Sequence, residues 1–451
     1  MDKKDIRNKK YSITDGKILP AFVMFALPLM AASCLMQSYV IADGLILGNA
    51  VNEEAIGSVS TVGPIIDLCT LVQIAIAGGC SICISHLFGA KRYNELDKLI
   101  DDMYRIIAVM SLAITALAFI GAPWILSLIN TPDSLMAGAT TYLRIVFIGV
   151  PFTSLYALQS GALRGMGDSK RPLGGIAVSS CVNIGLDLLF VIVFRWGIVG
   201  AAVATVTAQI LSAVYLYIKL EQRRRTYTLD PEHTTHSMLG ECVRLGAPQI
   251  IQSLATSGGN VLLQNVTNLL GASVVIGVTV AFKVDAILVI PLMCLGQATA
   301  VFTGQNMGAA KDERVRKTLE ISIVMSISIS VVMGIVLWLC GYSLMGLFGL
   351  GNEAALYGYK YIKVCMPFYW IFGLQFALNG FLNGAKHTVI TAFASIGSLA
   401  CRVAIAYLGY LSIGATILPI AESASWIVCV IADAVAIICF NRRKKSYRNI
   451  L

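Results

Sequence analysis

Long apolar stretches alternate with short polar segments along the whole chain of 451 residues. A helix needs about 20 consecutive apolar residues to cross the hydrocarbon core of a bilayer. Between Arg244 and Lys283 the chain carries no charge, and we divide this stretch at residues 268–272, where Asn and Gly favour a turn. The pattern therefore predicts twelve membrane-spanning helices, at roughly residues 19–47, 56–87, 106–128, 136–163, 172–194, 198–218, 239–269, 274–302, 319–348, 355–382, 389–411 and 413–440.

A polar segment at residues 219–240 separates the first six predicted spans from the last six. The two sides also share short motifs at one constant offset, which we call the repeat interval: FGAK at 88–91 and MGAA at 307–310, YLR at 142–144 and YIK at 361–363, GALRG at 161–165 and GFLNG at 380–384. We therefore predict an all-α integral membrane protein of twelve transmembrane helices in two six-helix lobes related by an internal repeat. The lobes are residues 1–218 and 241–451, and parallel repeats of this kind are a transporter architecture with the substrate site between the halves.

Composition supports a membrane protein, because 57% of the residues are hydrophobic, only 13% are charged and the mean hydropathy is +0.76. The net charge of +9 does not indicate a nucleic-acid partner. Most Lys and Arg residues fall in the segments that twelve spans place on one side, whereas the loops of the other side hold only Arg195. Because basic residues stay on the cytoplasmic side, we expect a multi-pass protein of the inner or plasma membrane with both termini and the linker in the cytoplasm.

Candidate chemistry gathers in the N-terminal lobe. Asn183 and Asp187 are four residues apart and share one helix face, after a basic Gly-rich turn at 164–171. Asp43 follows Tyr39 by one turn on the first span, and Thr205 precedes Gln209 by one turn on the sixth. Asp43, Asn183, Asp187 and Thr205 are therefore expected to meet in the outer half of the lobe. Two adjacent acids and two neutral oxygens suit a proton or sodium ion, and the alternative is a hydrogen-bonded cluster that only joins helices.

The C-terminal lobe carries polar stripes instead. Asn260, Gln264 and Asn268 are spaced by four on the seventh span, and Gln375, Asn379 and Asn383 repeat that spacing on the tenth. These stripes either line a wet cavity or form hydrogen bonds between helices. We predict a substrate cavity lined by Tyr39, Gln209, Asn260, Gln264, Gln375 and Asn379.

Further acids lie within or near the spans, namely Asp67, Asp285, Glu422 and Asp433. Because an unpaired acid is costly in a membrane, we interpret them as members of structural ion pairs, with Arg402 as a partner for one of them. Motifs of other function classes are missing. The sequence contains no HExxH and no Walker A loop, and Gly165 and Gly167 are not followed by the third glycine of a dinucleotide-binding GxGxxG loop. The chain is therefore predicted to be neither an enzyme nor an ATP-driven pump, and to need no cofactor.

These motifs together resemble the multidrug and toxin extrusion (MATE) family over essentially the whole chain. The resemblance rests on the GAKR turn at 89–92, the LRGMGDSKRP turn at 163–172 and the pair Asn183 and Asp187. It implies a cation-coupled antiporter that exports lipophilic cationic drugs or toxins, with Asp43, Asn183, Asp187 and Thr205 as the cation site. One branch of the family relies instead on acids in spans seven and ten. Here span seven has no acid after Arg244, and span ten has none after Glu353.

The mechanism that we expect is alternating access by a monomer embedded in lipid. A proton or sodium ion from outside binds around Asp43 and Asp187 and shifts a bend of the first span near Pro28. The resulting conformation binds the drug less well, so the drug leaves outward. The alternative function is a lipid-linked saccharide flippase of the same superfamily. A flippase would need a strongly cationic cavity, which intramembrane Arg144 and Lys363 weakly allow.

Overall fold

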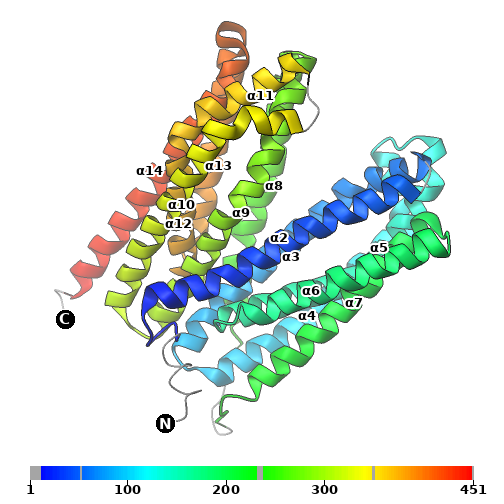
Figure 1. Cartoon of the computed structure of the whole chain (residues 1–451). Coiled ribbons are helices and arrows are strands. Elements are labelled where there is room, and N and C mark those ends of the chain that lie inside the picture. Colours follow the sequence, from blue (N-terminus) through cyan, green and yellow to red (C-terminus); the bar gives the residue numbers. More distant parts are fainter. Residues whose placement is uncertain (1–11, 51–52, 231–236, 348–350, 449–451) are drawn as a thin grey trace. The chain divides into compact units, whose positions relative to one another are not determined.

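The computed structural model describes residues 12–50, 53–230, 237–347 and 351–448, and within these ranges the backbone forms helices and turns without any strand (Figure 1). The helices of the N-terminal half are α2 (Ile18–Ala50), α3 (Glu53–Gly89), α4 (Tyr93–Leu128), α5 (Asp133–Gly165), α6 (Lys170–Asp187) with its continuation η1 (Leu188–Val193), and α7 (Gly197–Arg224). Those of the C-terminal half are α8 (Leu239–Leu269), α9 (Ala272–Gly308), α10 (Asp312–Leu347), α11 (Asn352–Cys365), η2 (Met366–Phe368), α12 (Tyr369–Gly384), α13 (Thr388–Ile413), η3 (Gly414–Thr416) and α14 (Ile417–Arg448).

The predicted all-α membrane fold is confirmed. Ten segments of the described chain are long and apolar enough to cross a membrane, and one of them, residues 388–440, contains both α13 and α14. With α8, the described helices form twelve rods, because η1 extends α6 and η2 joins α11 to α12. The break at η2 follows from Pro367, whose ring nitrogen cannot donate the next helical hydrogen bond.

The internal repeat is visible in the helix ends. Helices α3, α4 and α5 begin at 53, 93 and 133, and α9, α10 and the α11–α12 rod begin one repeat interval later, at 272, 312 and 352. The turns repeat as well. Left-handed backbone occurs at Lys91 and Arg195, and again after the same interval at Ala310 and Gly414. The same local sequence signals therefore build the same helix–turn order twice.

Packing divides the chain into two compact units, and the first residues of two helices, α2 and α8, belong to a different unit from the rest of the helix. The N-unit comprises Leu27–Ala247, and the C-unit comprises the described residues up to Ala26 together with those from Pro248 onward. Helix α2 thus passes from the C-unit to the N-unit beside Pro28, and α8 passes the opposite way beside Pro248. In the C-unit, Phe22 packs edge-on against Phe302 of α9 with ring centroids 5.2 Å apart. In the N-unit, Cys242 joins the core between α3, α4 and α5.

Each unit is organised around one rod. In the N-unit α5 packs against α3, α4 and α7, and in the C-unit the α11–α12 rod packs against α9, α10 and α14. Glycines allow the close crossings. A Cβ on Gly161 would lie 2.5 Å from the Ala77 carbonyl oxygen, and a Cβ on Gly380 would lie 2.3 Å from that of Gly296. One repeat interval separates the two glycines and also their two partners, so the repeat extends to the helix contacts.

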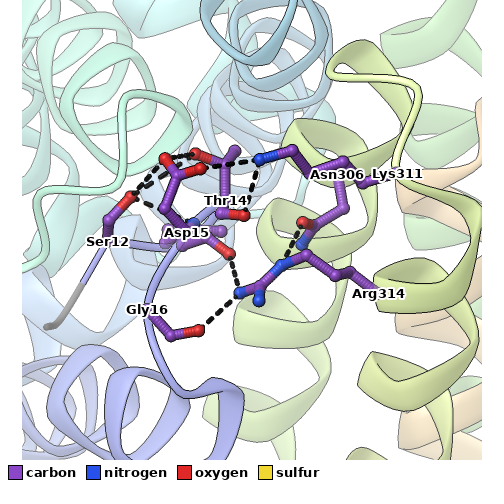
Figure 2. Close-up of polar contacts among 8 residues, drawn as sticks. Ser12, Thr14, Asp15, Gly16, Asn306, Lys311 and Arg314 are labelled. Atoms are coloured by element: carbon purple, nitrogen blue, oxygen red, sulfur yellow. Dashed lines mark hydrogen bonds and ion pairs between the residues drawn. The ribbon is translucent and has the colours of Figure 1, made fainter. Parts of the chain in front are cut away.

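The segment before α2 is fixed to the turn between α9 and α10 within the C-unit (Figure 2). Lys311 Nζ donates to the Thr14 carbonyl (3.0 Å) and to Asp15 Oδ1 (2.7 Å). Arg314 donates to the carbonyl oxygens of Ile13 (2.8 Å) and Gly16 (2.9 Å). The hydrogen bond and charge of Lys311 lower the pKa of Asp15 to about 2.

Candidate functional site

Helix α6 delivers two buried polar side chains into the N-unit. Asp168 lies two residues before this helix and satisfies its first turn, because its Oδ1 accepts the backbone N–H groups of Lys170 and Arg171, both at 3.2 Å. Asp187 is the last α-helical residue before the π-helical turn η1, and its side chain is fully buried. Such π turns occur frequently at functional sites, where they change which side chains face inward.

Polar residues from α2, α6 and α7 meet around Asp187. Asn183 Nδ2 donates to Thr205 Oγ1 at 3.2 Å, which joins α6 to α7. Asp43 of α2 and Asp187 interact through their carboxyl groups, and the Tyr39 hydroxyl lies beside Thr205 within electrostatic range of both acids. The structure therefore brings together the four predicted cation-site residues and Tyr39. Their role in ion binding stays a prediction.

The cluster is short of hydrogen-bond donors. Within the described residues no amide, hydroxyl or basic group satisfies either carboxylate oxygen of Asp187, and Asp43 Oδ1 and Asn183 Oδ1 are likewise buried without a partner. An acid in this state is costly inside a membrane unless a cation accompanies it. The four groups offer carboxylate, amide and hydroxyl oxygens, which are the ligands that hard cations prefer. The arrangement is therefore suited to receive a proton or a small hard cation.

Tyr142 belongs to the same cluster and was missed as a site residue. It lies on α5, is buried, and is within electrostatic range of Tyr39, Asp43 and Asp187. The sequence marked it only as part of the repeated YLR motif, which says nothing about the direction of its side chain. Gln209 lies one turn beyond Thr205, and its Oε1 occupies space that a Cβ on Gly149 would enter at 2.0 Å. Gly149 thus makes room for the Gln209 side chain against α5.

A second polar region is a cavity of about 390 Å3 within the C-unit, which we call the C-unit cavity. Helices α8, α9, α10, α11, α13 and α14 line it, and Asn260 and Gln264, two of the six residues predicted to line a substrate cavity, are among its wall residues. Their role in substrate binding stays a prediction. Gln375 and Asn379 are not among the wall residues. Asn379 Nδ2 instead donates to Asp433 Oδ2 at 2.7 Å, a hydrogen bond between α12 and α14. The two predicted polar stripes of this half therefore lie in different surroundings.

Charged side chains also face the C-unit cavity. Arg402 of α13 forms the expected ion pair, and its partner is Glu422 of α14. The Tyr361 hydroxyl donates to Glu422 Oε2 at 3.1 Å, and the Tyr369 hydroxyl donates to Asp285 Oδ1 at 2.7 Å. Sequence reasoning missed both tyrosines, because spacing along one helix does not reveal which neighbouring helix supplies a partner. No group of three or more His, Cys, Asp or Glu residues in the described chain is arranged to hold a metal ion.

Comparison with known proteins assigns the class. The chain matches the MatE family twice, over residues 28–189 and 248–408. It is 29% identical over 378 residues to a probable multidrug resistance protein of Bacillus subtilis, YpnP, covering 84% of this chain and 85% of that protein. It is 22% identical to the multidrug export protein MepA of Staphylococcus haemolyticus, covering 82% of both chains.

Solved structures show the same fold. A multidrug resistance MATE family transporter of the MOP superfamily, in an outward-facing conformation, superposes with a TM-score of 0.88 at 19% identity over 97% of this chain and 99% of that one. A MOP superfamily transporter from Pyrococcus furiosus gives 0.84 at 19% identity over 98% and 99%. Fold, repeat and family match therefore define a multi-pass membrane transporter. The chain belongs to the multidrug and toxin extrusion family, as the turn at 163–172 and the pair Asn183 and Asp187 predicted.

Proposed function

We propose that this transporter exports lipophilic cationic drugs or toxins in exchange for a proton or a sodium ion, by alternating access. The observation that carries the proposal is the buried Asp187, whose carboxylate oxygens have no partner among the described residues except the neighbouring acid Asp43. The names of the similar proteins, multidrug resistance and multidrug export, support the substrate class. The protein works as a monomer in the cell membrane, with both termini in the cytoplasm, and needs no cofactor.

In this mechanism Asp43, Asn183, Asp187 and Thr205 form the coupling site. An ion that enters from outside binds between the two carboxyl groups and is held by the Asn183 and Thr205 oxygens. Ion binding shifts α2 at Pro28, where the helix lacks one backbone hydrogen bond. The ion displaces drug only by its differential affinity for the two conformations. Each positive charge moving inward contributes about 2.3 kcal/mol per 100 mV of membrane potential.

We propose that the two lobes comprise residues 1–218 and 241–451 and that the segment 219–240 links them. Polar and aromatic side chains of both lobes hold the substrate. Tyr39 and Gln209 serve in the N-terminal lobe, and Asn260, Gln264, Gln375 and Asn379 serve in the C-terminal lobe. The flippase alternative is not favoured. Arg144, one of the two basic residues that allow it, donates to the Phe119 carbonyl at 3.1 Å and lies over the Phe119 ring. That arginine therefore has a local partner.

Transport in proteoliposomes tests the proposal. Wild-type protein should accumulate a fluorescent cation when a proton or a sodium gradient is imposed, and the effective gradient identifies the ion. Asp187→Asn and Asp43→Asn keep the side-chain shape and remove the charge that the ion neutralises, so both variants should lose gradient-driven transport while drug binding in detergent survives. Wild-type rates in a folded Asp187→Asn variant would mean that the cluster is structural and that the ion binds elsewhere.

A further inference from the structure

The C-unit cavity has a charge arrangement that a structural ion pair alone does not explain. Two acids and one base line it, Asp285 from α9, Glu422 from α14 and Arg402 from α13. Arg402 pairs with Glu422 and interacts electrostatically with Asp285, which otherwise receives a hydrogen bond from Tyr369. With all three groups ionised the set carries one excess negative charge. A charge in a membrane interior is costly unless it is paired, so either a proton or a bound cation must balance this set.

The remaining walls suit an organic cation. Phe282, Tyr361 and Trp426 line the cavity, and the Arg402 guanidinium already lies 5.8 Å above the centroid of the Phe282 ring. Aromatic faces attract organic cations in the same way. The volume of about 390 Å3 falls within the range of roughly 300–1,000 Å3 found for small-molecule sites. Asn260 and Gln264 add neutral hydrogen-bonding groups at one wall.

Arg402 is only partly engaged in this arrangement. Its Nε is buried and has no hydrogen-bond partner among the described residues, although Asp285 lies within electrostatic range. The guanidinium therefore has one acid that it contacts directly and a second acid near it. If the Arg402 guanidinium moved from Glu422 toward Asp285, the Glu422 carboxylate would lose its ion pair and keep only the hydrogen bond from the Tyr361 hydroxyl.

We propose that the C-unit cavity binds one lipophilic monocation, and that Arg402 acts as a tethered cation that occupies Glu422 when no ligand is present. The incoming cation takes the place of Arg402 at Glu422 and packs against the aromatic walls, while Arg402 turns toward Asp285. Arg402 thereby sets which ligand charge the cavity prefers, because one base and two acids are neutralised by a single added positive charge. This inference rests on the proposed substrate class, and it adds a defined binding place within the C-unit and the residue that selects for charge there.

Charge-swap variants test this inference by equilibrium binding in detergent, without any gradient. Tetraphenylphosphonium serves as the monocation and dequalinium as the dication. Glu422→Gln removes the anchoring acid and should weaken tetraphenylphosphonium binding by about tenfold or more. Arg402→Met raises the excess negative charge to two and should shift preference toward dequalinium by about tenfold. The double variant restores one excess negative charge, so it should bind tetraphenylphosphonium more tightly than Glu422→Gln alone.

Controls separate binding from folding. Asp433→Asn removes another buried acid on the same helix α14, outside the cavity, and should bind both ligands like the wild type. Thermal unfolding of each variant is measured in parallel, and if Glu422→Gln does not fold, Arg402→Met and the double variant still report the charge preference. Unchanged affinities and unchanged preference in every folded variant would overturn the inference and leave a structural ion pair.

The test is also distinguishable from that of the proposed function. If no gradient drives transport but the variants change binding as described, the coupling proposal fails and the cavity assignment stands. If gradient-driven export is observed while the Arg402 and Glu422 variants bind both ligands as the wild type does, the cavity assignment fails alone.

Discussion

At the scale of single residues, the N-unit cluster combines one well-formed hydrogen bond with several unsatisfied oxygens. Asn183 Nδ2 is oriented by Thr205 Oγ1, so the Asn183 oxygen is turned to the other side, where it is buried without a partner. A side-chain amide held in this way presents its oxygen in a fixed direction. A fixed oxygen is a suitable ligand for a hard cation. Thr205 is therefore a positioning residue for Asn183 as well as a proposed ligand.

Thr205→Val tests this positioning, because valine has nearly the shape of threonine but offers no acceptor to Asn183. We expect a loss of stability of about 1–3 kcal/mol from the unsatisfied amide. We also expect a higher ion concentration for half-maximal transport. Thr205→Ser keeps the hydroxyl and should behave like the wild type in both measurements. Equal ion dependence in the valine and serine variants would contradict the positioning role.

The contact between Asp15 and Lys311 predicts a pH dependence at the start of α2. Because the folded-state pKa of Asp15 is lowered from its ordinary value of 3.8 to about 2, the contact stabilises the folded form fully above pH 4. That contribution is lost as the pH falls from 4 toward 2. Both side chains are partly exposed, so it amounts to at most about 1 kcal/mol. Hydrogen-exchange protection at residues 12–17, taken relative to the intrinsic exchange rate at each pH, should fall over this range, and in Lys311→Met it should be low already at pH 5.

At the scale of elements, the glycines of the α3–α5 crossing and of its repeat, α9 against α12, set how closely the helices approach. Gly161→Ala and Gly380→Ala would each bring a methyl group within 2.5 Å of a backbone carbonyl oxygen. Backbone cannot move as a flexible side chain does, so we expect each variant to lose about 1–3 kcal/mol of stability. Thermal unfolding in detergent measures this loss.

Gly185→Ala is the matched control for the crossing glycines, because no atom lies within 4 Å of its added Cβ. Alanine is the better helix former by about 1 kcal/mol, so this variant should be as stable as the wild type or more stable. Equal destabilisation at Gly161, Gly380 and Gly185 would mean that the helix crossings are not limited by backbone contact.

Hydrophobic runs predicted the twelve rods well, because lipid requires every span to be apolar and helical. Helix ends were less predictable. Helix α4 begins at Tyr93 instead of near residue 106, since buried Leu96, Leu99 and Met103 continue its packed face beneath charged neighbours. The N-terminal cluster was predictable because acids in apolar runs are rare. The C-unit cavity was not, because its walls come from six helices whose neighbours are decided by packing alone.

At the scale of the whole molecule, the family match in both halves and the repeated helix ends show that the chain contains an internal repeat of six helices. Because six predicted spans separate the two copies, we predict that both copies have the same orientation in the membrane, so that the sidedness of one loop gives that of the whole chain. Several described basic residues lie at or beside the helix ends that we predict to face the cytoplasm, namely Lys311, Arg314 and Arg224.

Cysteine labelling from outside the cell measures this sidedness in a background without the twelve native cysteines. A cysteine in place of the exposed Arg195, between η1 and α7, should react with a membrane-impermeant maleimide. A cysteine in place of the exposed Thr226, just after α7, should react only after the cells are opened. The reverse pattern would invert the topology.

The exchange of helix beginnings between the units has a consequence for synthesis. The N-unit is complete only when residues 239–247 have left the ribosome, since Cys242 and Leu245 belong to its core. Residues 12–26 wait much longer, because Phe22 packs against Phe302 and the segment at 12–16 binds Lys311 and Arg314. These residues are therefore made well before their partners and are among the last to reach their final place.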